Sequence, residues 1–344
     1  MNLVEIAAQL GVSPASVSIV RNGRPGVSSA TRRRIEKALE ENGIPYTPFT
    51  SPRASADTPA KSSRSRYIHL VKFYRSALLT DKNEGFVDDI VDVIDAIVRS
   101  AGYALLFSSI SYQEYDAFLQ RLQEDKSDGL LIIATEMSRD EILRLADFQR
   151  PLVLLDSDHP GLPISSVSMD NRGLAYNAVL QLSSLGEVGH LASRIPTGNF
   201  IARGIGYWEA VLAMHLSWED DLIFHVTPSL TGACEDVLQL LDQGRRVPKA
   251  FFADNDVIAI GAMRALMQRG YRIPQDVQII GVDNTLLSQI STPALSTTQI
   301  SRVDLGENAI QLLLRQMAAQ QRSTMHIRTG TFLILRDSTL QSPA

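Results

Sequence analysis

The stretch LVEIAAQLGVSPASVSIVRNG at residues 3–23 decides the fold of the N-terminal end. Its first apolar residues recur at helical spacing, and Gly11 can end a helix in the left-handed conformation. Ser13 and Pro14 are residue types that open a helix, as N-cap and first helical residue. The two predicted helices are separated by Gly11 and Val12 alone. Such a short connection predicts a helix-turn-helix.

The second predicted helix has an inner and an outer side. Val17 and Val20 take the inner side. The outward residues are Pro14, Ala15, Ser18 and Ile19. An outward isoleucine fits a face that enters the DNA major groove, where a thymine methyl offers an apolar partner. The alternative is a structural three-helix cap with one exposed isoleucine, because isolated apolar side chains are common on surfaces.

The chain continues as VSSATRRRIEKALEENG at residues 27–43, which predicts a third helix between Ser28 and Gly43. Its inward residues are Ile35, Ala38 and Leu39. Together, residues 2–43 closely resemble the DNA-binding head of the lactose-repressor (LacI/GalR) family of bacterial transcription regulators.

The resemblance implies positions for DNA contacts. It places Pro14, Ala15 and Ile19 where the family reads bases. It places Asn2, Ser13, Ser16, Asn22 and Ser28 where the family contacts phosphates or caps helices. We add Ser18 on the outward face, and Arg32 and Arg33 as phosphate anchors. The predicted partner is a palindromic double-stranded operator, bound by a homodimer whose heads are about 34–36 Å apart.

Charge is distributed unevenly along the 344 residues. Residues 1–66 carry ten Lys and Arg against five acidic residues, a net of +5, whereas the remainder has 23 basic and 33 acidic residues, a net of −10. A basic head on an acidic body suits a protein that places one end on phosphates. The alternative is a solvated charge bias.

Composition excludes several other classes. The sequence contains no run of 18 apolar residues, so we expect no membrane span. The N-terminus lacks the pattern of a secretory signal. The single cysteine, Cys234, rules out an intramolecular disulfide and a cysteine-rich zinc site, and we expect it to be buried. We therefore expect a cytoplasmic protein without a cofactor or a metal.

Residues 46–66 predict a linker between the head (1–45) and the body (67–344), because they are rich in Pro, Ser, Thr and Ala and nearly lack large apolar groups. Members of the resembled family carry here a hinge helix whose leucine wedges into the minor groove. This linker has Pro52 and Pro59, which oppose a continuous helix, and no leucine. We therefore expect little kinking at the operator's centre.

The body alternates strand-like and helix-like segments. Apolar runs predict buried parallel strands at 67–73, 103–109, 128–134, 151–156, 249–254 and 277–283. An amphipathic helix is predicted at 85–102, with a stripe of Phe86, Ile90, Val93, Ile94 and Ile97. The fold class is thus α/β, with parallel sheets flanked by helices. The length predicts two lobes, one formed by about 67–164 and 293–322 and the other by about 165–292 and 323–344.

Other functions were weighed for such a body. A Rossmann-type enzyme would need a G-x-G-x-x-G after the first strand, which the sequence lacks, and no catalytic motif is found. The six histidines are scattered along the sequence, so we interpret them as surface or structural residues. A solute-binding protein would need an export signal and would not carry a helix-turn-helix.

The body also resembles the lactose-repressor family, whose sensor shares the fold of periplasmic sugar-binding proteins. The resemblance lies in AFFADNDVIAIGAMRALMQRGYRIPQDVQIIGVDN and its continuation (250–314), and in residues 166–192 and 202–211. Residues 71–86 depart from the family pattern. The resemblance maps effector-binding positions to Asp156, Arg203, Asn255 and Asp283.

The chemistry of these four residues fits a small polar effector, expected to be a sugar. Carboxylates accept hydrogen bonds from hydroxyls, arginine donates them and asparagine does both. Tyr74 and Phe86 are the candidates for an aromatic wall. Structural alternatives stay open: Asp283 and Asn255 as helix caps, Arg203 as a surface ion pair, and Asp156 as a strand end. The sequence thus predicts a ligand-responsive repressor of carbohydrate uptake or catabolism genes and no enzyme.

Overall fold

The computed structural model of the chain describes residues 29–42, 44–45, 66–76, 86–319 and 323–340, together with seven residues of the N-terminal segment. Those seven are Ile6, Ala7, Leu10, Val12, Val17, Val20 and Arg21. The chain divides into two compact units, residues 1–63 and 64–344, and each is described by itself.

The first unit has a small apolar core. Helix α3 (Ser29–Glu41) contributes Ile35, Ala38 and Leu39, which are buried as predicted. Ile6, Ala7, Val17 and Val20 pack with them, and all four are helical. The inner faces predicted for the second and third helices are therefore confirmed.

The predicted DNA contacts lie outside the described residues. Those positions are Asn2, Ser13, Pro14, Ala15, Ser16, Ser18, Ile19, Asn22 and Ser28. Arg32 and Arg33 belong to α3, but their side chains are likewise outside the description. The same holds for linker residues 46–65.

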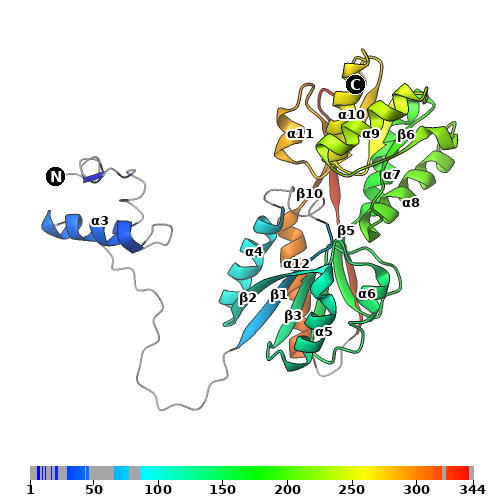
Figure 1. Ribbon diagram of the computed structural model, residues 1–344. Helices are drawn as coiled ribbons and strands as arrows, with labels where there is room; N and C mark the ends of the chain where they lie inside the picture. Colours follow the sequence, from blue (N-terminus) through cyan, green and yellow to red (C-terminus); the bar gives the residue numbers. More distant parts are fainter. Residues whose placement is uncertain are drawn as a thin grey trace. The chain divides into compact units, whose positions relative to one another are not determined.

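The second unit contains two lobes, each built on a six-stranded sheet (Figure 1). The first sheet has the order β11-β5-β4-β3-β1-β2, and all of its strand pairs are parallel. Its strands are β1 (Tyr67–Tyr74), β2 (Ala104–Ser111), β3 (Gly129–Ile133), β4 (Leu152–Leu155), β5 (Ser165–Met169) and β11 (His326–Thr329).

Helices cover both faces of the first sheet. Its covering helices are α4 (Phe86–Ser100), α5 (Tyr115–Glu124), α6 (Arg139–Leu143) and α12 (Arg302–Ala318). Successive strand residues point to opposite faces: Leu70 packs in the core under α4 and α12, whereas Val71 packs in the core under α5 and α6. A sheet buried on both sides explains the continuous apolar runs of its strands.

The second sheet has the order β12-β10-β9-β8-β6-β7, and its one antiparallel pair is β10 with β12. Its strands are β6 (Gly189–Ser193), β7 (Ile223–Val226), β8 (Ala250–Ala253), β9 (Gln278–Val282), β10 (Ser296–Ile300) and β12 (Thr331–Ile334). The helices of this lobe are α7 (Asn171–Leu182), α8 (Gly198–Ala213), α9 (Leu230–Asp242), α10 (Asp256–Gln268) and α11 (Leu286–Ile290).

The chain crosses between the lobes three times. The crossings are at Asp170, between β5 and α7; at Ser301, between β10 and α12; and at Gly330, between β11 and β12. The Asp170 amide donates to the Thr329 carbonyl at 3.0 Å, which joins two of the crossings.

These crossings correct the predicted lobe boundaries. Strand β5 belongs to the first lobe rather than the second, and β10 belongs to the second rather than the first. Strand β11 also pairs in the first sheet, next to β5. The error arose because the sequence carries no local signal at a crossing, where one strand ends and the next element simply starts in the other lobe.

All six predicted strands form, within one or two residues of their expected ends, and α4 forms within the helix predicted at 85–102. Cys234 is buried, as expected. Within the described part of the chain, no helix has the length and apolar character required to cross a bilayer.

Candidate effector site

The predicted effector residues gather where strands end. Asp156 directly follows β4, Asp283 directly follows β9, and Asn255 lies two residues beyond β8. The carboxyl ends of parallel strands share one edge of a sheet, and ligands of such folds bind beyond that edge. Arg203 reaches the same place from α8 and is 3% exposed, which excludes the alternative of a surface ion pair.

The backbone is left-handed at two of these carboxylates. The φ angle is 57° at Asp156 and 108° at Asp283. Residues other than glycine rarely adopt a positive φ, because this backbone conformation is energetically costly. Residues in such conformations cluster at ligand sites. Asp283 caps no helix, because Thr285 is the N-cap of α11.

Arg203 is held by three groups inside the second lobe. Its Nε donates to Asn171 Oδ1 at 2.9 Å, and its Nη1 donates to the carbonyl oxygen of Asp254. Its Nη2 lies 3.7 Å from Asp283 Oδ1. A rigid, multiply bonded guanidinium is a pre-organised hydrogen-bond donor.

A chain of hydrogen bonds connects Arg203 to the first lobe. Asn171 Nδ2 donates to Asn199 Oδ1 at 3.2 Å, and Asn199 Nδ2 donates to Asp156 Oδ1 at 3.0 Å. Asn199 belongs to α8 and Asp156 follows β4, so this last bond links the two lobes. We call Asp156, Asn199, Asn171, Arg203 and Asp283 the inter-lobe network.

The pKa of Asp156 is raised to about 6, chiefly by burial and also by the charge of Asp283. The hydroxyl of Thr135, which donates to Asp156 Oδ2 at 2.6 Å, and the nearby Arg203 oppose this rise in pKa. The site thus confines carboxylates around one guanidinium in a medium that hydrates them poorly.

Asp256 is a further buried carboxylate beside this network. It accepts hydrogen bonds from the hydroxyl of Thr297 at 2.5 Å and from the amide of Thr285 at 2.8 Å. Burial raises its pKa to about 7, and the nearby charge of Asp283 adds to the rise. By binding both threonines, Asp256 fixes the turn that carries Asp283.

The remaining predicted residues have different placements. Asn255 is the N-cap of α10, and its Oδ1 accepts from the Ile258 amide at 2.9 Å, so the cap alternative holds for its oxygen. Tyr74 is the half-buried last residue of β1, at the same sheet edge as Asp156. Phe86 is the first residue of α4, and its side chain lies outside the described residues.

Sequence reasoning missed Thr135, Asn171 and Asn199. Thr135 follows β3 and could have been found by the same strand-end rule that found Asp156. Asn171 and Asn199 lie in the first turns of α7 and α8, where an asparagine resembles ordinary helix-start chemistry. Their role depends on the approach of two helices, which local sequence does not encode.

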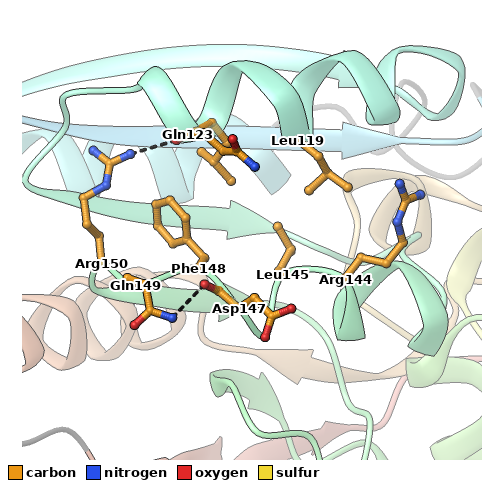
Figure 2. Close-up of a pocket in the computed structure, with 9 residues that line it drawn as sticks. Leu119, Gln123, Arg144, Leu145, Asp147, Phe148, Gln149 and Arg150 are labelled. Carbon is orange, nitrogen blue, oxygen red and sulfur yellow. Dashed lines mark hydrogen bonds between the residues drawn. The ribbon is translucent and has the colours of Figure 1, made fainter.

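A cavity of about 660 Å³ lies elsewhere on the first lobe (Figure 2). It is bordered by Leu119 and Gln123 of α5 and by the segment from Arg144 to Arg150. Arg150 Nη2 donates to the Leu122 carbonyl at 2.9 Å. Residue 150 precedes β4, so this cavity extends to the amino ends of the strands, away from the edge where such sheets bind ligands.

The described residues contain no group of three His, Cys, Asp or Glu side chains that could hold a metal ion.

Comparison with known protein families gives two matches. Residues 2–48 match the family described as bacterial regulatory proteins, lacI family, and residues 196–339 match a periplasmic binding protein-like domain.

Similar curated proteins are regulators. The transcriptional regulator DegA of Bacillus subtilis (strain 168) is 28% identical over 345 residues, covering 98% of this chain and 97% of DegA. The transcriptional repressor CytR of Escherichia coli (strain K12) is also 28% identical, covering 98% of this chain and 96% of CytR.

Solved structures share the fold over the full length. A lac repressor dimer bound to operator and the anti-inducer ONPF has a TM-score of 0.70 at 24% identity, covering 99% of both chains. A complex of the regulator CelR with cellobiose has a TM-score of 0.70 at 22% identity, covering 98% of this chain and 99% of CelR.

Proposed function

Because this chain belongs to the lactose-repressor (LacI/GalR) family of DNA-binding transcription regulators, we propose that it represses genes of carbohydrate uptake or catabolism in response to a sugar. In this proposal a cytoplasmic homodimer binds a palindromic operator through residues 14–19 of each head. The sugar binds between the two lobes of each body and changes the affinity for the operator.

The inter-lobe network is the observation that supports a sugar. It offers carboxylate acceptors at Asp156, at the carboxyl end of the first sheet, and at Asp283, at the carboxyl end of the second sheet, and a fixed donor at Arg203. Hydroxyl groups both donate and accept, so a polyhydroxylated ligand can satisfy this mixture. The amide Nδ2 of Asn255 is a further donor, because the helix cap uses only the oxygen.

The same network suggests how binding reaches the DNA. The hydrogen bond from Asn199 to Asp156 joins the lobes, and a ligand that bridges the same groups changes the relative stability of open and closed arrangements. A ligand shifts such an equilibrium by its differential affinity for the two states. Closure of two bodies in a dimer alters the spacing of the heads.

The atypical linker completes the proposal. It carries no leucine to insert at the operator's centre, so binding depends on the heads and on their spacing. We expect the central operator step to be nearly straight in a complex. A sharp kink at the dyad in a structure of the complex would contradict this.

A gel-shift assay tests the function directly. Purified protein is expected to shift DNA upstream of neighbouring transport genes in preference to random duplex, and one or more sugars found by thermal shift should change that binding. Asp283→Ala should weaken binding of the best sugar about tenfold or more, whereas Asp147→Ala, an exposed aspartate, should not. Equal sugar affinity in Asp283→Ala and wild type would refute the site, and a lack of preference for any genomic fragment would refute the function.

A further inference from the structure

A second cavity, of about 650 Å³, opens at the carboxyl end of the first sheet. We call it the lateral cavity. Arg75, Tyr112 and Glu136 line it, and they follow the neighbouring strands β1, β2 and β3. Ile195 and Pro196 of the second lobe line its other side. The cavity therefore lies between the lobes, at the edge where the effector site lies.

The lateral cavity and the inter-lobe network share two stretches of chain. Thr135, whose hydroxyl donates to Asp156 at 2.6 Å, directly precedes Glu136 of the cavity wall. Pro196 directly precedes Thr197, the N-cap of α8, which carries Asn199 and Arg203. Because adjacent Cα atoms are about 3.8 Å apart, a ligand at Asp156 has the cavity next to it.

Glu136 carries an unsatisfied buried atom at the wall of the lateral cavity. Its side chain is buried, with the residue 5% exposed. Oε2 accepts hydrogen bonds from the amides of Arg75 at 2.9 Å and Ser76 at 2.7 Å, but Oε1 has no partner. A buried carboxylate oxygen without a donor is costly, so its retention points to a donor supplied by a ligand.

The charges of the cavity select the kind of ligand. Its two arginines are paired: Arg75 with Glu141 at 2.6 Å, and Arg144 with Asp116 at 2.7 Å. Four carboxylates and two guanidinium groups line it, a net of −2. The Arg75 guanidinium also lies 4.2 Å from the centre of the Tyr112 ring, which further fixes it. Such a wall disfavours phosphate and other anions and accepts hydroxyl donors.

We propose that the effector is a disaccharide, with one ring on the inter-lobe network and the second in the lateral cavity, where a hydroxyl donates to Glu136 Oε1. This inference rests on the proposed function. The cavity volume lies within the range of about 300–1,000 Å³ that is usual for small-molecule sites, before any space at the network is added.

The test compares disaccharides with their own monosaccharides on the full-length protein by isothermal titration calorimetry. The probes are cellobiose, maltose, lactose and sucrose against glucose, galactose and fructose, with glucose 6-phosphate, cytidine and adenosine as further arms. At least one disaccharide should bind about tenfold or more tightly than either of its component sugars. Glucose 6-phosphate should bind no better than glucose.

Two variants locate the second ring. Glu136→Gln, which replaces the unpaired acceptor Oε1 by an amide group, should lower the affinity for the disaccharide about tenfold. It should leave the affinity for monosaccharides unchanged. Ile195→Trp, which fills the cavity from the second lobe, should do the same without altering Glu136. Glu307→Gln, an exposed residue of α12, is the control and should change neither affinity.

A panel in which no disaccharide binds more tightly than its components overturns the inference, whether the best ligand is a monosaccharide, a nucleoside or none. Equal losses for both sugar classes in Glu136→Gln and Ile195→Trp also overturn it. If a monosaccharide still controls operator binding in the gel shift, the proposed function stands and only the second ring is wrong.

Discussion

At the scale of single residues, the candidate site combines features that oppose stability. Asp156 and Asp283 have positive φ angles, and Asp156 and Asp256 are carboxylates buried with raised pKa values. A fold that needed stability alone would place glycine and apolar residues there. Their presence together at the carboxyl ends of the two sheets is typical of a site selected for binding.

The first prediction concerns pH. The pKa of Asp256 is raised from 3.8 to about 7, so between these values the folded state binds a proton that the unfolded state lacks. The stabilisation is complete below pH 4 and is lost as pH rises through about 7, by at most about 1.4 kcal/mol per pH unit. Asp256→Asn should therefore flatten the fall in unfolding free energy between pH 5 and 8.

Urea unfolding at pH 5, 6, 7 and 8 measures this fall. Asp147→Asn, an exposed aspartate of the same lobe as Asp156, is the control and should keep the wild-type slope. An unchanged slope in Asp256→Asn would show that this carboxylate titrates at its ordinary pKa.

The second prediction concerns Arg203. Lysine keeps the charge but cannot reach Asn171, Asp254 and Asp283 together, because it lacks the planar fork of arginine. Arg203→Lys should lower the unfolding free energy by about 1–3 kcal/mol and lower the affinity for the effector at least about tenfold. Chemical denaturation and calorimetry measure the two effects. Arg139→Lys, at an exposed arginine, should leave both quantities unchanged. If Arg203→Lys also changed neither the unfolding free energy nor the effector affinity, the positive charge at position 203 would be sufficient for both.

At the scale of elements, α8 is positioned by its close contact with α7. A Cβ on Gly206 would meet the carbonyl oxygen of Arg172 at 2.1 Å, whereas a Cβ on Gly204 of the same helix would find its nearest atom at 3.9 Å. Glycine at 206 thus permits the helix approach that brings Asn199 to Asn171.

The third prediction compares these two glycines. Gly206→Ala should destabilise the protein by about 1–3 kcal/mol through overpacking. Gly204→Ala should be neutral or stabilising by up to about 1 kcal/mol, because alanine favours a helix. Thermal unfolding of both variants gives the comparison. Similar melting temperatures would show that α7 shifts to accommodate the added methyl group without loss of stability.

Two of the strands that the sequence did not indicate lack a continuous apolar run. The six predicted strands are runs of aliphatic and aromatic residues, whereas β5 (SSVSM) and β10 (STTQI) are buried but rich in hydroxyls. Two of these hydroxyls bind partners distant in sequence: Ser165 Oγ accepts from Gln316 at 2.7 Å, and Thr297 donates to Asp256. Partners more than 40 residues away leave no local periodicity.

The candidate site was predictable in part for a similar reason. Family resemblance indicated Asp156, Asn255 and Asp283, and their positions after apolar strands agreed with it. Arg203 was indicated by family resemblance, since an arginine within an amphipathic helix carries no sign of burial. The hydrogen bonds among Asn171, Asn199 and Asp156 depend on how two lobes meet, which only the three-dimensional structure gives.

At the scale of the whole molecule, the head and linker (residues 1–66) carry a net charge of +5 and the remainder carries −10. Binding to DNA phosphates releases counterions, whereas binding of an uncharged sugar does not. The two proposed activities, operator binding and sugar binding, should therefore respond differently to salt.

The fourth prediction measures that difference. Operator affinity should fall linearly with salt concentration on logarithmic axes, and the double variant Arg32→Ala, Arg33→Ala, which removes four charges from a dimer, should reduce the slope by about 4. Sugar affinity should change little over the same range. Arg121→Ala, at an exposed arginine of α5, should leave the slope unchanged. A slope unaffected by the double variant would remove these arginines from the phosphate contacts.

The last crossing, at Gly330, also affects when the two sheets can be completed during synthesis. Strands β11 and β12 flank this glycine and complete the first and second sheets, respectively, so both sheets wait for the same late segment of the chain. The head emerges early, and domains fold as they leave the ribosome. A message cut short after Ala318 would yield a finished head on a body whose β5 and β10 edges lack partners, and open edges of this kind recruit other chains into aggregates.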